Sequence, residues 1–205
     1  MKPSKTSKQW MREHVNDPFV QLAKKEGYRS RAAYKLLEID AKDHLFKAGL
    51  VAVDLGATPG GWSQIAVGKV GQGGKVIALD ILPMNPLPGV DFIQGDFRED
   101  GVLKQLEELL HGRPVGLVIS DMAPNISGVN SMDQARVMHL AELAMEFALE
   151  HLEPQGSFLV KVFQGEGFEA FLKLMRSRFT RVVSRKPKAS RDRSSELYLL
   201  ASGKK

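Results

Sequence analysis

A glycine-rich turn between an expected strand and an expected helix constrains this chain more than any other feature. Residues 51–55 (VAVDL) predict a strand buried on both faces, because four of the five are apolar. Residues 56–61 (GATPGG) then break the pattern, and a helical pattern begins near Trp62. A strand, a glycine turn and a helix in this order bind nucleotide-like ligands in α/β folds. Glycine lets the backbone approach the ligand, and the helix N-terminus offers free N–H groups.

Two common ligands of such a turn are excluded by single residues. A dinucleotide fingerprint needs a second glycine two positions after Gly56, where this chain has Thr58. A phosphate-binding P-loop needs a lysine between Gly61 and Ser63, where this chain has Trp62, so the phosphates of ATP would not be neutralised. A nucleoside-type ligand without phosphates, such as S-adenosylmethionine, remains. A tight turn with no ligand is the alternative.

Strands and helices alternate from residue 50 onward, which predicts a mainly parallel sheet covered by helices on both faces. Two strands in succession at the C-terminus indicate a closing hairpin with one antiparallel strand. Expected strands cover residues 51–55, 75–80, 90–94, 115–120, 157–163, 181–184 and 196–201, and expected helices cover residues 61–69, 99–110, 131–152 and 168–178. The third of these helices starts at a capping box, residues 131–134 (SMDQ). An earlier helical pattern over residues 19–37 is interrupted at Gly27.

The length and composition bound the class of protein. A chain of 205 residues suits one domain with a full core, and we expect a basic N-terminal arm over residues 1–18 and a single domain over residues 19–205. No cysteine occurs, which excludes disulfides, thiolate metal sites and cysteine nucleophiles. No apolar run approaches the roughly 20 residues that span a bilayer, and the N-terminus lacks the apolar core of a secretory signal. We therefore expect a cytoplasmic protein with no membrane partner.

Charge is divided unevenly along the chain, although the net charge is only +5. Residues 1–35 hold nine Lys or Arg against three acidic residues, and residues 173–193 hold nine against one. Residues 36–172 hold nine against nineteen. An acidic body with basic segments at both ends is typical of a protein that binds a polyanion. Either segment alone could be ordinary solvated surface, but the two together favour nucleic acid.

Four aspartates lie at or just after the ends of the first four expected strands: Asp54, Asp80, Asp96 and Asp121. Ligands of open α/β sheets bind beyond the carboxyl ends of the strands. Asp80 could accept hydrogen bonds from ribose hydroxyls, Asp96 from an adenine amino group, and Asp121 would face a sulfonium group. A single aspartate at a strand end is usually a loop cap, but four in register with the glycine turn favour an adenosyl ligand.

A lysine interrupts the expected strand over residues 157–163. Lys161 stands in the apolar run LVKVF, where a buried ammonium without a partner would be costly. It is either part of a structural ion pair or a general base. Glu196 breaks the last expected strand in a similar way and is a candidate partner. Lys35, one helical turn after Arg31, is by periodicity an ordinary surface lysine.

Several motifs together resemble the FtsJ/RrmJ family of S-adenosylmethionine-dependent RNA ribose 2′-O-methyltransferases. The motifs are SRAAYKL at 30–36, DLG at 54–56, PGGW at 59–62, SDMAP at 120–124, VKVFQG at 160–165, RKP at 185–187 and SELY at 195–198. They extend over nearly the whole chain. The resemblance implies a Rossmann-like methyltransferase fold, with S-adenosyl-L-methionine as the methyl donor and no metal.

The resemblance also implies which residues act. The family's Lys-Asp-Lys-Glu tetrad falls on Lys35, Asp121, Lys161 and Glu196, and its methyl-donor contacts fall on Gly60, Trp62, Asp80, Asp96 and Asp121. A ribose 2′-hydroxyl is a very weak acid and must lose its proton as it attacks the methyl group. The family assigns the base to Lys161, with Lys35 and Glu196 positioning the ribose, whereas the sequence alone does not separate the two lysines. Thr58 departs from the alanine that is common before PGGW, but it keeps a small residue there.

The implied substrate is a uridine of 23S ribosomal RNA, on the assembled or nearly assembled large ribosomal subunit. The basic segments would bind RNA phosphates, and we expect a monomer or a weakly associated protein. The same chemistry on transfer or messenger RNA is the nearest alternative. A non-catalytic RNA-binding assembly factor is disfavoured by the intact tetrad, and a protein methyltransferase is disfavoured by the basic flanks.

Overall fold

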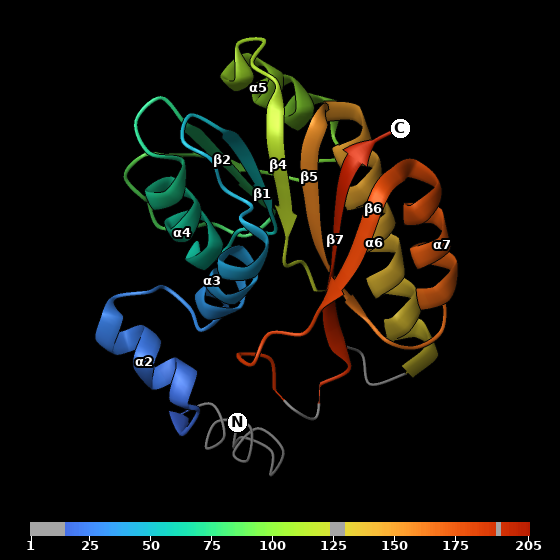
Figure 1. Cartoon of the computed structure of the whole chain (residues 1–205). Helices are drawn as coiled ribbons and strands as arrows, with labels where there is room; N and C mark the ends of the chain where they lie inside the picture. Colours follow the sequence, from blue (N-terminus) through green and yellow to red (C-terminus); the bar gives the residue numbers. More distant parts are fainter. Residues whose placement is uncertain (1–14, 124–129, 192–193) are drawn as a thin grey trace.

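The structure, a computed structural model, describes residues 15–123, 130–191 and 194–205. Its centre is one seven-stranded sheet with the order β3-β2-β1-β4-β5-β7-β6 (Figure 1). The strands are β1 Val51–Leu55, β2 Lys75–Asp80, β3 Val90–Gln94, β4 Val115–Ser120, β5 Leu152–Phe163, β6 Phe179–Arg185 and β7 Glu196–Lys204. Neighbouring strands are parallel except in the two pairs that include β7. The expected mostly parallel sheet with an antiparallel C-terminal strand is confirmed.

Helices cover both faces of this sheet (Figure 1). They are α2 Pro18–Glu26, α3 Ala32–Asp43, α4 Gly61–Val70, α5 Asp100–Leu110, α6 Asn130–His151 and α7 Phe168–Arg178. On one face, α3 and α4 share a buried cluster that includes Leu36 and Ile65. On the other face, α5, α6 and α7 share a cluster that includes Leu106 and Met145. None of the described helices is both long and apolar enough to cross a membrane.

The apolar patterns account for these layers. All five residues of β1 and all six of β4 are buried, as expected for central strands that are covered on both faces. The helix α5 instead buries one stripe, Val102, Leu106 and Leu110, which lie four residues apart. Burial of a side chain such as Leu106 stabilises the fold by about 1.5–3 kcal/mol.

Some boundaries differ from the sequence prediction. β5 begins at Leu152, five residues earlier than expected, because this residue already pairs with β4. The register between β4 and β5 then shifts, so Pro154 and Gly156, which predict a loop, lie in an irregular stretch of the strand. β6 and β7 are also longer than expected, at residues 179–185 and 196–204.

Two expectations fall partly outside the described residues. These are the first 14 residues of the expected arm and the Ser131 side chain of the expected capping box. At the end of the arm, the Asp17 side chain accepts a hydrogen bond from the Phe19 backbone N–H (3.0 Å) and so caps α2.

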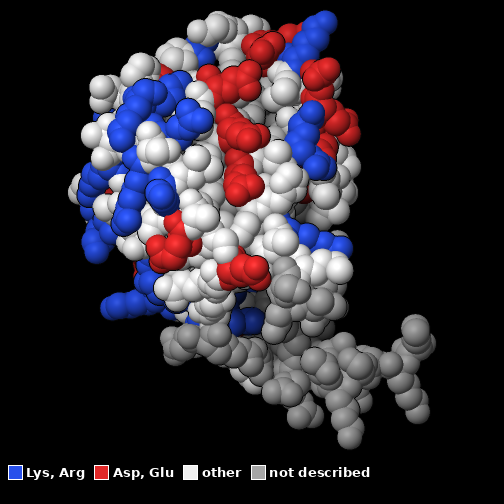
Figure 2. All heavy atoms as spheres, turned by 90° about the vertical axis from the view of Figure 1, so that its right-hand side faces the viewer, with Lys and Arg blue, Asp and Glu red and all other residues white. Residues whose placement is uncertain are grey.

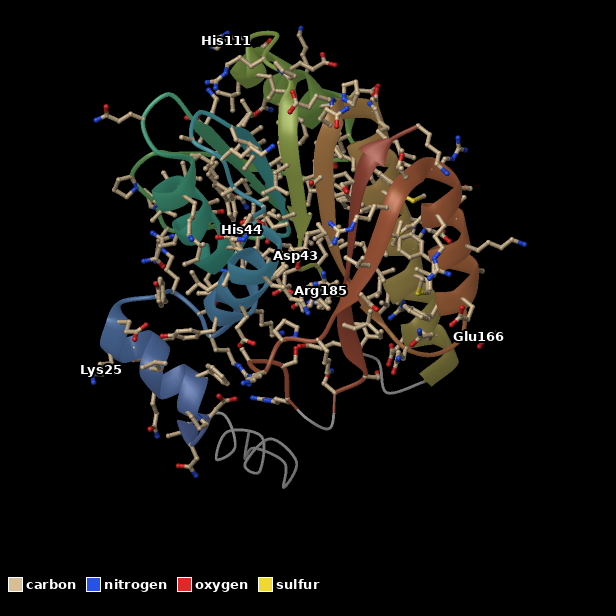
Figure 3. The ribbon with its side chains drawn as sticks, viewed as in Figure 1. Lys25, Asp43, His44, His111, Glu166 and Arg185 are labelled. Carbon is tan, nitrogen blue, oxygen red and sulfur yellow. The ribbon has the colours of Figure 1, made fainter. Side chains whose placement is uncertain are left out.

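The C-terminal hairpin of β6 and β7 is tied to α3 by an ion pair. Asp43, the last residue of α3, and Arg185, the last residue of β6, point toward one another (Figure 3). The Arg185 guanidinium donates from Nε to Asp43 Oδ2 and from Nη2 to Oδ1, each at 2.6 Å. Such a two-point contact fixes geometry better than a single hydrogen bond does.

Opposite charges are segregated on the face that carries α6 and α7. Figure 2 shows Asp and Glu in a column on this face, with Lys and Arg gathered beside it. The helix α6 exposes Glu142, Glu146 and Glu150 one turn apart. The adjacent helix α7 exposes Lys173 and Arg176.

Candidate active site

A cavity of about 450 Å³ opens at the carboxyl ends of the central strands. Asp80 lies at the end of β2, Asp96 follows β3 and Asp121 follows β4, and all three line the cavity. Met122 and Leu140 contribute apolar walls. Three of the four predicted strand-end carboxylates therefore meet at one cavity.

The glycine turn forms the floor of this cavity. Gly56 has a left-handed backbone (φ 75°), and a Cβ at this position would overlap the Met122 side chain. The Gly56 N–H donates to Leu79 O at 2.9 Å, so the turn is fastened to β2. Gly60 is also left-handed (φ 101°), and a Cβ there would lie 2.8 Å from Met84 Sδ. Only glycine fits both positions.

Asp80 is held in place by the backbone. Its Oδ2 accepts from the Thr58 N–H and its Oδ1 accepts from the Leu82 N–H, both at 2.8 Å. Each carboxylate oxygen has two lone pairs, so one on each oxygen is left for a ligand hydroxyl. This arrangement suits a vicinal diol.

Asp96 is held by an arginine two residues away. Arg98 Nε donates to both Asp96 oxygens at 2.9 and 3.0 Å, and the Arg98 N–H donates to Oδ1 at 3.0 Å. These hydrogen bonds keep the pKa of Asp96 below its ordinary value despite partial burial. Asp96 is therefore an ionised acceptor at the cavity wall.

Trp62 does not turn its indole toward the cavity. The ring is buried, donates from Nε1 to Ala32 O at 2.7 Å, and lies 5.6 Å from the ring of Tyr198. It joins α4 to α3 and supports Tyr198. The Gly60 N–H donates to Ala57 O at 2.6 Å, whereas the first turn of a helix leaves its backbone N–H groups free. The expected contacts of Gly60 and Trp62 with the methyl donor stay predictions.

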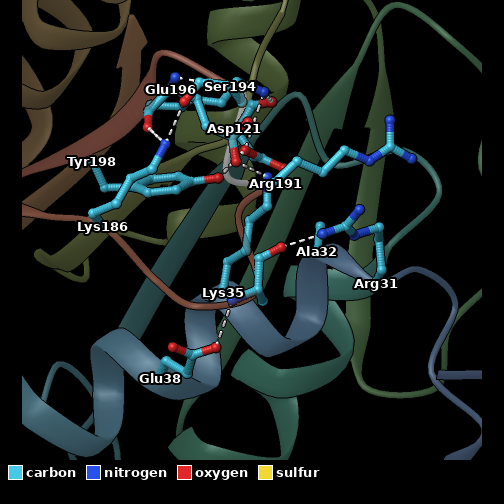
Figure 4. A network of polar contacts seen from close by, with 12 residues as sticks. Arg31, Ala32, Lys35, Glu38, Asp121, Lys186, Arg191, Ser194, Glu196 and Tyr198 are labelled. Carbon is cyan, nitrogen blue, oxygen red and sulfur yellow. Dashed lines mark hydrogen bonds and ion pairs between the residues drawn. The ribbon is translucent and has the colours of Figure 1, made fainter. Parts of the chain in front are cut away.

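The four residues of the predicted tetrad form two ion pairs close to this cavity, and Figure 4 shows three of them, Lys35, Asp121 and Glu196. Lys161 Nζ lies 3.1 Å from Asp121 Oδ1 and donates to Asp121 O at 2.6 Å. Lys35 Nζ lies 2.6 Å from Glu196 Oε1. Both lysines are only 8% exposed. Lys35, which by periodicity is a surface lysine, is therefore buried, because the C-terminal hairpin covers this face of α3.

Tyr198 joins the two pairs, although sequence reasoning gives it no role. Its hydroxyl donates to Asp121 Oδ1 at 2.8 Å, and Lys35 Nζ lies 5.7 Å from the centre of its ring. Tyr198 pairs with Lys161 in the antiparallel register of β5 and β7. A signal exists in the sequence, since Tyr198 stands two residues after Glu196 and so shares its face of the strand.

The environment fixes the charge of two of these groups. Burial raises the pKa of Glu196, but the charge and hydrogen bond of Lys35, together with a hydrogen bond from Ser190, lower it further, so the pKa lies below its ordinary value and Glu196 is ionised. Burial raises the pKa of Tyr198 well above its ordinary value, and Asp121 adds to this. Tyr198 therefore stays a neutral phenol, whose hydroxyl donates a hydrogen bond to Asp121.

We name the segment between β6 and β7, residues 186–195, the hairpin loop. Its described residues, 186–191 and 194–195, close one side of the site. The Glu38 carboxylate of α3 accepts the backbone N–H groups of Lys188 (2.7 Å) and Ala189 (2.9 Å). Arg31 donates to Asp17 and to Ala189 O. The loop that leads into Glu196 is thus fastened to the helix that carries Lys35.

Asp54, the fourth predicted carboxylate, lies beneath the site rather than in it. It is 1% exposed, and its Oδ2 accepts from Ser63 Oγ at 2.6 Å. Burial, followed by the charges of Asp121 and Asp80, raises its pKa to about 7, although the Ser63 hydrogen bond opposes this. No group of three or more His, Cys, Asp or Glu among the described residues is arranged to hold a metal ion.

Comparisons with known proteins find relatives that match nearly the whole chain. The sequence model of a family described as FtsJ-like methyltransferase matches residues 28–204. A Ribosomal RNA large subunit methyltransferase E from Dechloromonas aromatica is 68% identical over 200 residues, which cover 98% of each chain. The protein of that name from Chromobacterium violaceum is 63% identical over 205 residues and 100% of both chains.

Solved structures share the fold. A crystal structure of a ribosomal RNA methyltransferase from Plasmodium falciparum matches with a TM-score of 0.78 at 30% identity, over 86% of this chain and 98% of the other. A Streptococcus mutans methyltransferase in complex with SAH matches with a TM-score of 0.50 at 14% identity, over 84% of this chain and 95% of the other. The second match supports the fold alone.

Proposed function

Because the chain belongs to the FtsJ-like methyltransferase family, we propose that it methylates the ribose 2′-hydroxyl of a uridine in 23S ribosomal RNA, with S-adenosylmethionine as donor. The observation that carries the proposal is the position of Asp121, which lines the cavity and also holds Lys161. This residue joins a site that fits an adenosyl ligand to an amine that can take a proton. The names of the relatives support the large ribosomal subunit as the substrate.

The cavity residues fit the donor in size and chemistry. A volume of about 450 Å³ suits a nucleoside-sized ligand. Asp80 would accept the ribose hydroxyls of the donor, Asp96 its adenine amino group, and Asp121 would face its sulfonium charge. When bound, the donor would supply a methyl group on a positively charged sulfur, and the neutral thioether that keeps the electron pair of the broken S–C bond is a good leaving group.

Lys161 and Lys35 would have different roles toward the acceptor ribose. Lys161 accepts the proton that the 2′-hydroxyl loses as its oxygen takes the methyl group, and only the neutral amine can do this. Asp121 fixes the position of Lys161 Nζ through two contacts. Lys35, held by Glu196, positions the ribose oxygen, and much of the rate comes from this orientation.

Cations near the site would bind the RNA. Lys186 and Lys188 of the hairpin loop are exposed, and Lys24 and Lys25 are exposed on α2. Contacts with phosphates make binding depend on salt and carry no sequence information. We further propose that residues 1–18 act as an RNA-binding arm of a single catalytic domain, and that the protein works as a monomer in the cytoplasm.

The test is transfer of labelled methyl groups to large subunits that lack the modification. We expect Lys161→Ala to lower the turnover number by about 10²–10⁴-fold, because a positioned general base contributes that much. Donor affinity, measured by calorimetry, should stay close to that of the wild type. Lys75→Ala is the matched control, because Lys75 also forms an ion pair (Asp91, 2.8 Å) but on the surface.

Two results would contradict the proposal. Near-normal turnover by the Lys161→Ala variant would contradict the assignment of Lys161 as the general base. Methylated nucleotides can also be mapped in cells with and without the protein. If the methyl groups that depend on the protein lay in transfer RNA, the substrate would be transfer RNA and not ribosomal RNA.

A further inference from the structure

Four exposed cations lie away from the candidate active site. They are Lys173, Arg176 and Arg178 of α7 and Arg181 of β6, and we name them the distal basic face. In the sequence they belong to the same basic segment as the hairpin loop. In the fold the two groups are separated by the length of β6.

The strand register gives the size of this separation. Phe179, the first residue of β6, pairs with Lys204, which lies six residues along β7 from Tyr198, the partner of Lys161 in β5. At about 3.3 Å per residue, this places the start of β6 roughly 20 Å along the strands from Lys161. A nucleotide whose ribose lies at Lys161 would not reach the distal basic face.

These four cations form no ion pairs with the described part of the chain. Among the residues that the structure describes, no carboxylate lies within ion-pair distance of any of the four side chains. Glu142, Glu146 and Glu150 are exposed on the neighbouring helix α6, yet they form a separate acidic stripe (Figure 2). Clustered like charges repel one another, and a bound polyanion relieves this repulsion.

We infer that the distal basic face binds the phosphates of a second ribosomal RNA segment, apart from the segment that carries the acceptor ribose. The inference rests on the proposed function, which makes RNA the polyanion. Arginine, which supplies three of the four cations, binds phosphate oxygens in a bidentate manner. A flat anionic membrane would also meet the acidic stripe of α6, whereas an RNA strand can follow the basic face alone.

This second contact defines the substrate class more closely. An RNA that engages both places must extend over roughly 20 Å in a fixed shape, as estimated from the strand rise. A folded ribosomal RNA domain or an assembled subunit has such a shape. A short acceptor strand does not, so the distal basic face would favour large folded substrates.

The test compares the wild type with the variant Arg176→Gln/Arg178→Gln/Arg181→Gln on large subunits that lack the methyl group. We expect KM to rise on the order of tenfold at low salt, with kcat unchanged. The slope of log KM against log salt should fall by roughly 2, because each lost phosphate contact removes about 0.7–0.9. A purely structural role would not change this slope.

A charge-balanced variant separates a local contact from net charge. Adding Glu142→Gln, Glu146→Gln and Glu150→Gln restores the net charge of the wild type. We expect KM to stay high in this six-fold variant. A return of KM to the wild-type value, or an unchanged KM and salt slope in the three-fold variant, would overturn the inference. Failure of the wild type to methylate subunits at all would instead overturn the proposed function.

Discussion

Asp121 is the residue on which the site depends most. Its backbone oxygen and Oδ1 both contact Lys161, and Oδ1 also accepts the Tyr198 hydroxyl. The same residue lines the cavity. A carboxylate with two such contacts has little freedom to rotate, and the backbone oxygen adds a second contact to Lys161, so Lys161 Nζ is placed before any ligand binds.

The substitution Tyr198→Phe tests how far this placement depends on the phenol. The ring and its packing on Trp62 stay, but Asp121 loses one of its two side-chain partners. We expect the free energy of unfolding to fall by about 1.5–3 kcal/mol, as for other hydrogen bonds to charged groups. We also expect kcat to fall, because Asp121 no longer holds Lys161 in one position. Urea unfolding and single-turnover methyl transfer measure the two effects.

Tyr34→Phe is the control for this substitution. The Tyr34 hydroxyl donates to Glu26 Oε2 at 2.7 Å, so it makes the same kind of bond on the α2 side of α3. We expect a loss of stability without a loss of kcat. Equal loss of kcat in both variants would mean that the Tyr198 hydroxyl has no particular role in the site.

Gly56→Ala tests the floor of the cavity. Gly56 has a left-handed backbone, which lowers the stability of a residue with a Cβ by about 1–2 kcal/mol. The methyl group of the alanine would also displace the Met122 side chain from the cavity wall. We expect lower stability and weaker donor binding, measured by urea unfolding and calorimetry. Gly68→Ala is the control, because a Cβ there meets open space in α4 and should stabilise the helix by about 0.8–1.0 kcal/mol. Unchanged donor affinity in Gly56→Ala would contradict this account.

At the scale of elements, the hairpin loop links both halves of the site. Glu38 holds two backbone N–H groups of the loop, so Glu38→Ala should free the loop and loosen the contact of Glu196 with Lys35. We expect kcat/KM for the RNA substrate to fall at least tenfold, since each hydrogen bond to a charged group such as the Glu38 carboxylate contributes about 1.5–3 kcal/mol. Donor affinity should stay the same, because none of the described residues of the loop lines the cavity.

Glu38→Gln and Asp91→Ala complete this experiment. The glutamine keeps one acceptor oxygen and should recover part of the activity. Asp91→Ala breaks an ion pair whose carboxylate is 46% exposed, and such pairs contribute little. If Glu38→Ala retained full activity, the loop would reach its position without α3.

The same elements show what sequence patterns can and cannot predict. The bounds of β1, β2, β3, β4 and α7 agree with the prediction, because apolar periodicity and turn residues are local signals. The start of β5 was predicted wrongly, because Pro154 and Gly156 signal a loop and only the pairing with β4 overrides them. The contact of Glu38 with the hairpin loop joins residues 150 apart, so no local pattern reveals it.

In the candidate site, too, sequence patterns predict some of the residues and contacts and not others. The strand-end carboxylates could be expected to meet, since parallel strands place their carboxyl ends at one edge of the sheet. The role of Tyr198 depends on its register with Lys161 across β5 and β7, and that register is set by the whole hairpin. The hold of Arg98 on Asp96 is local, but an exposed arginine two residues from an aspartate is too common to predict a contact.

At the scale of the whole molecule, the sheet gathers negative charge at one end. Asp54, Asp80 and Asp121 all lie near the carboxyl ends of β1, β2 and β4. Asp54 is buried there, and its pKa is raised from 3.8 to about 7, by burial first and by the other two carboxylates next. The folded protein therefore keeps a proton on Asp54 under conditions in which the unfolded chain has lost it.

This proton makes stability depend on pH with a definite sign. Between about pH 4 and pH 7 the folded state binds more protons at Asp54 than the unfolded state, so the contribution of Asp54 to the free energy of unfolding falls as pH rises. The contribution is complete below the unfolded pKa and is lost above the folded one. Asp54→Asn cannot titrate, so the difference in stability, wild type minus variant, should decrease across this window and then level off. Urea unfolding at intervals from about pH 4 to about pH 8 measures it.

Ser63→Ala extends the same argument. The Ser63 hydroxyl donates to Asp54 at 2.6 Å, which stabilises the ionised carboxylate and lowers its pKa. Without the hydroxyl the folded protein should hold the proton to a higher pH, so the decrease should continue beyond about pH 7. Parallel stability curves for the wild type, Asp54→Asn and Ser63→Ala would mean that Asp54 is ionised in the folded state. The buried charge would then require a compensating cation, and a donor with a positive sulfur would supply one close by.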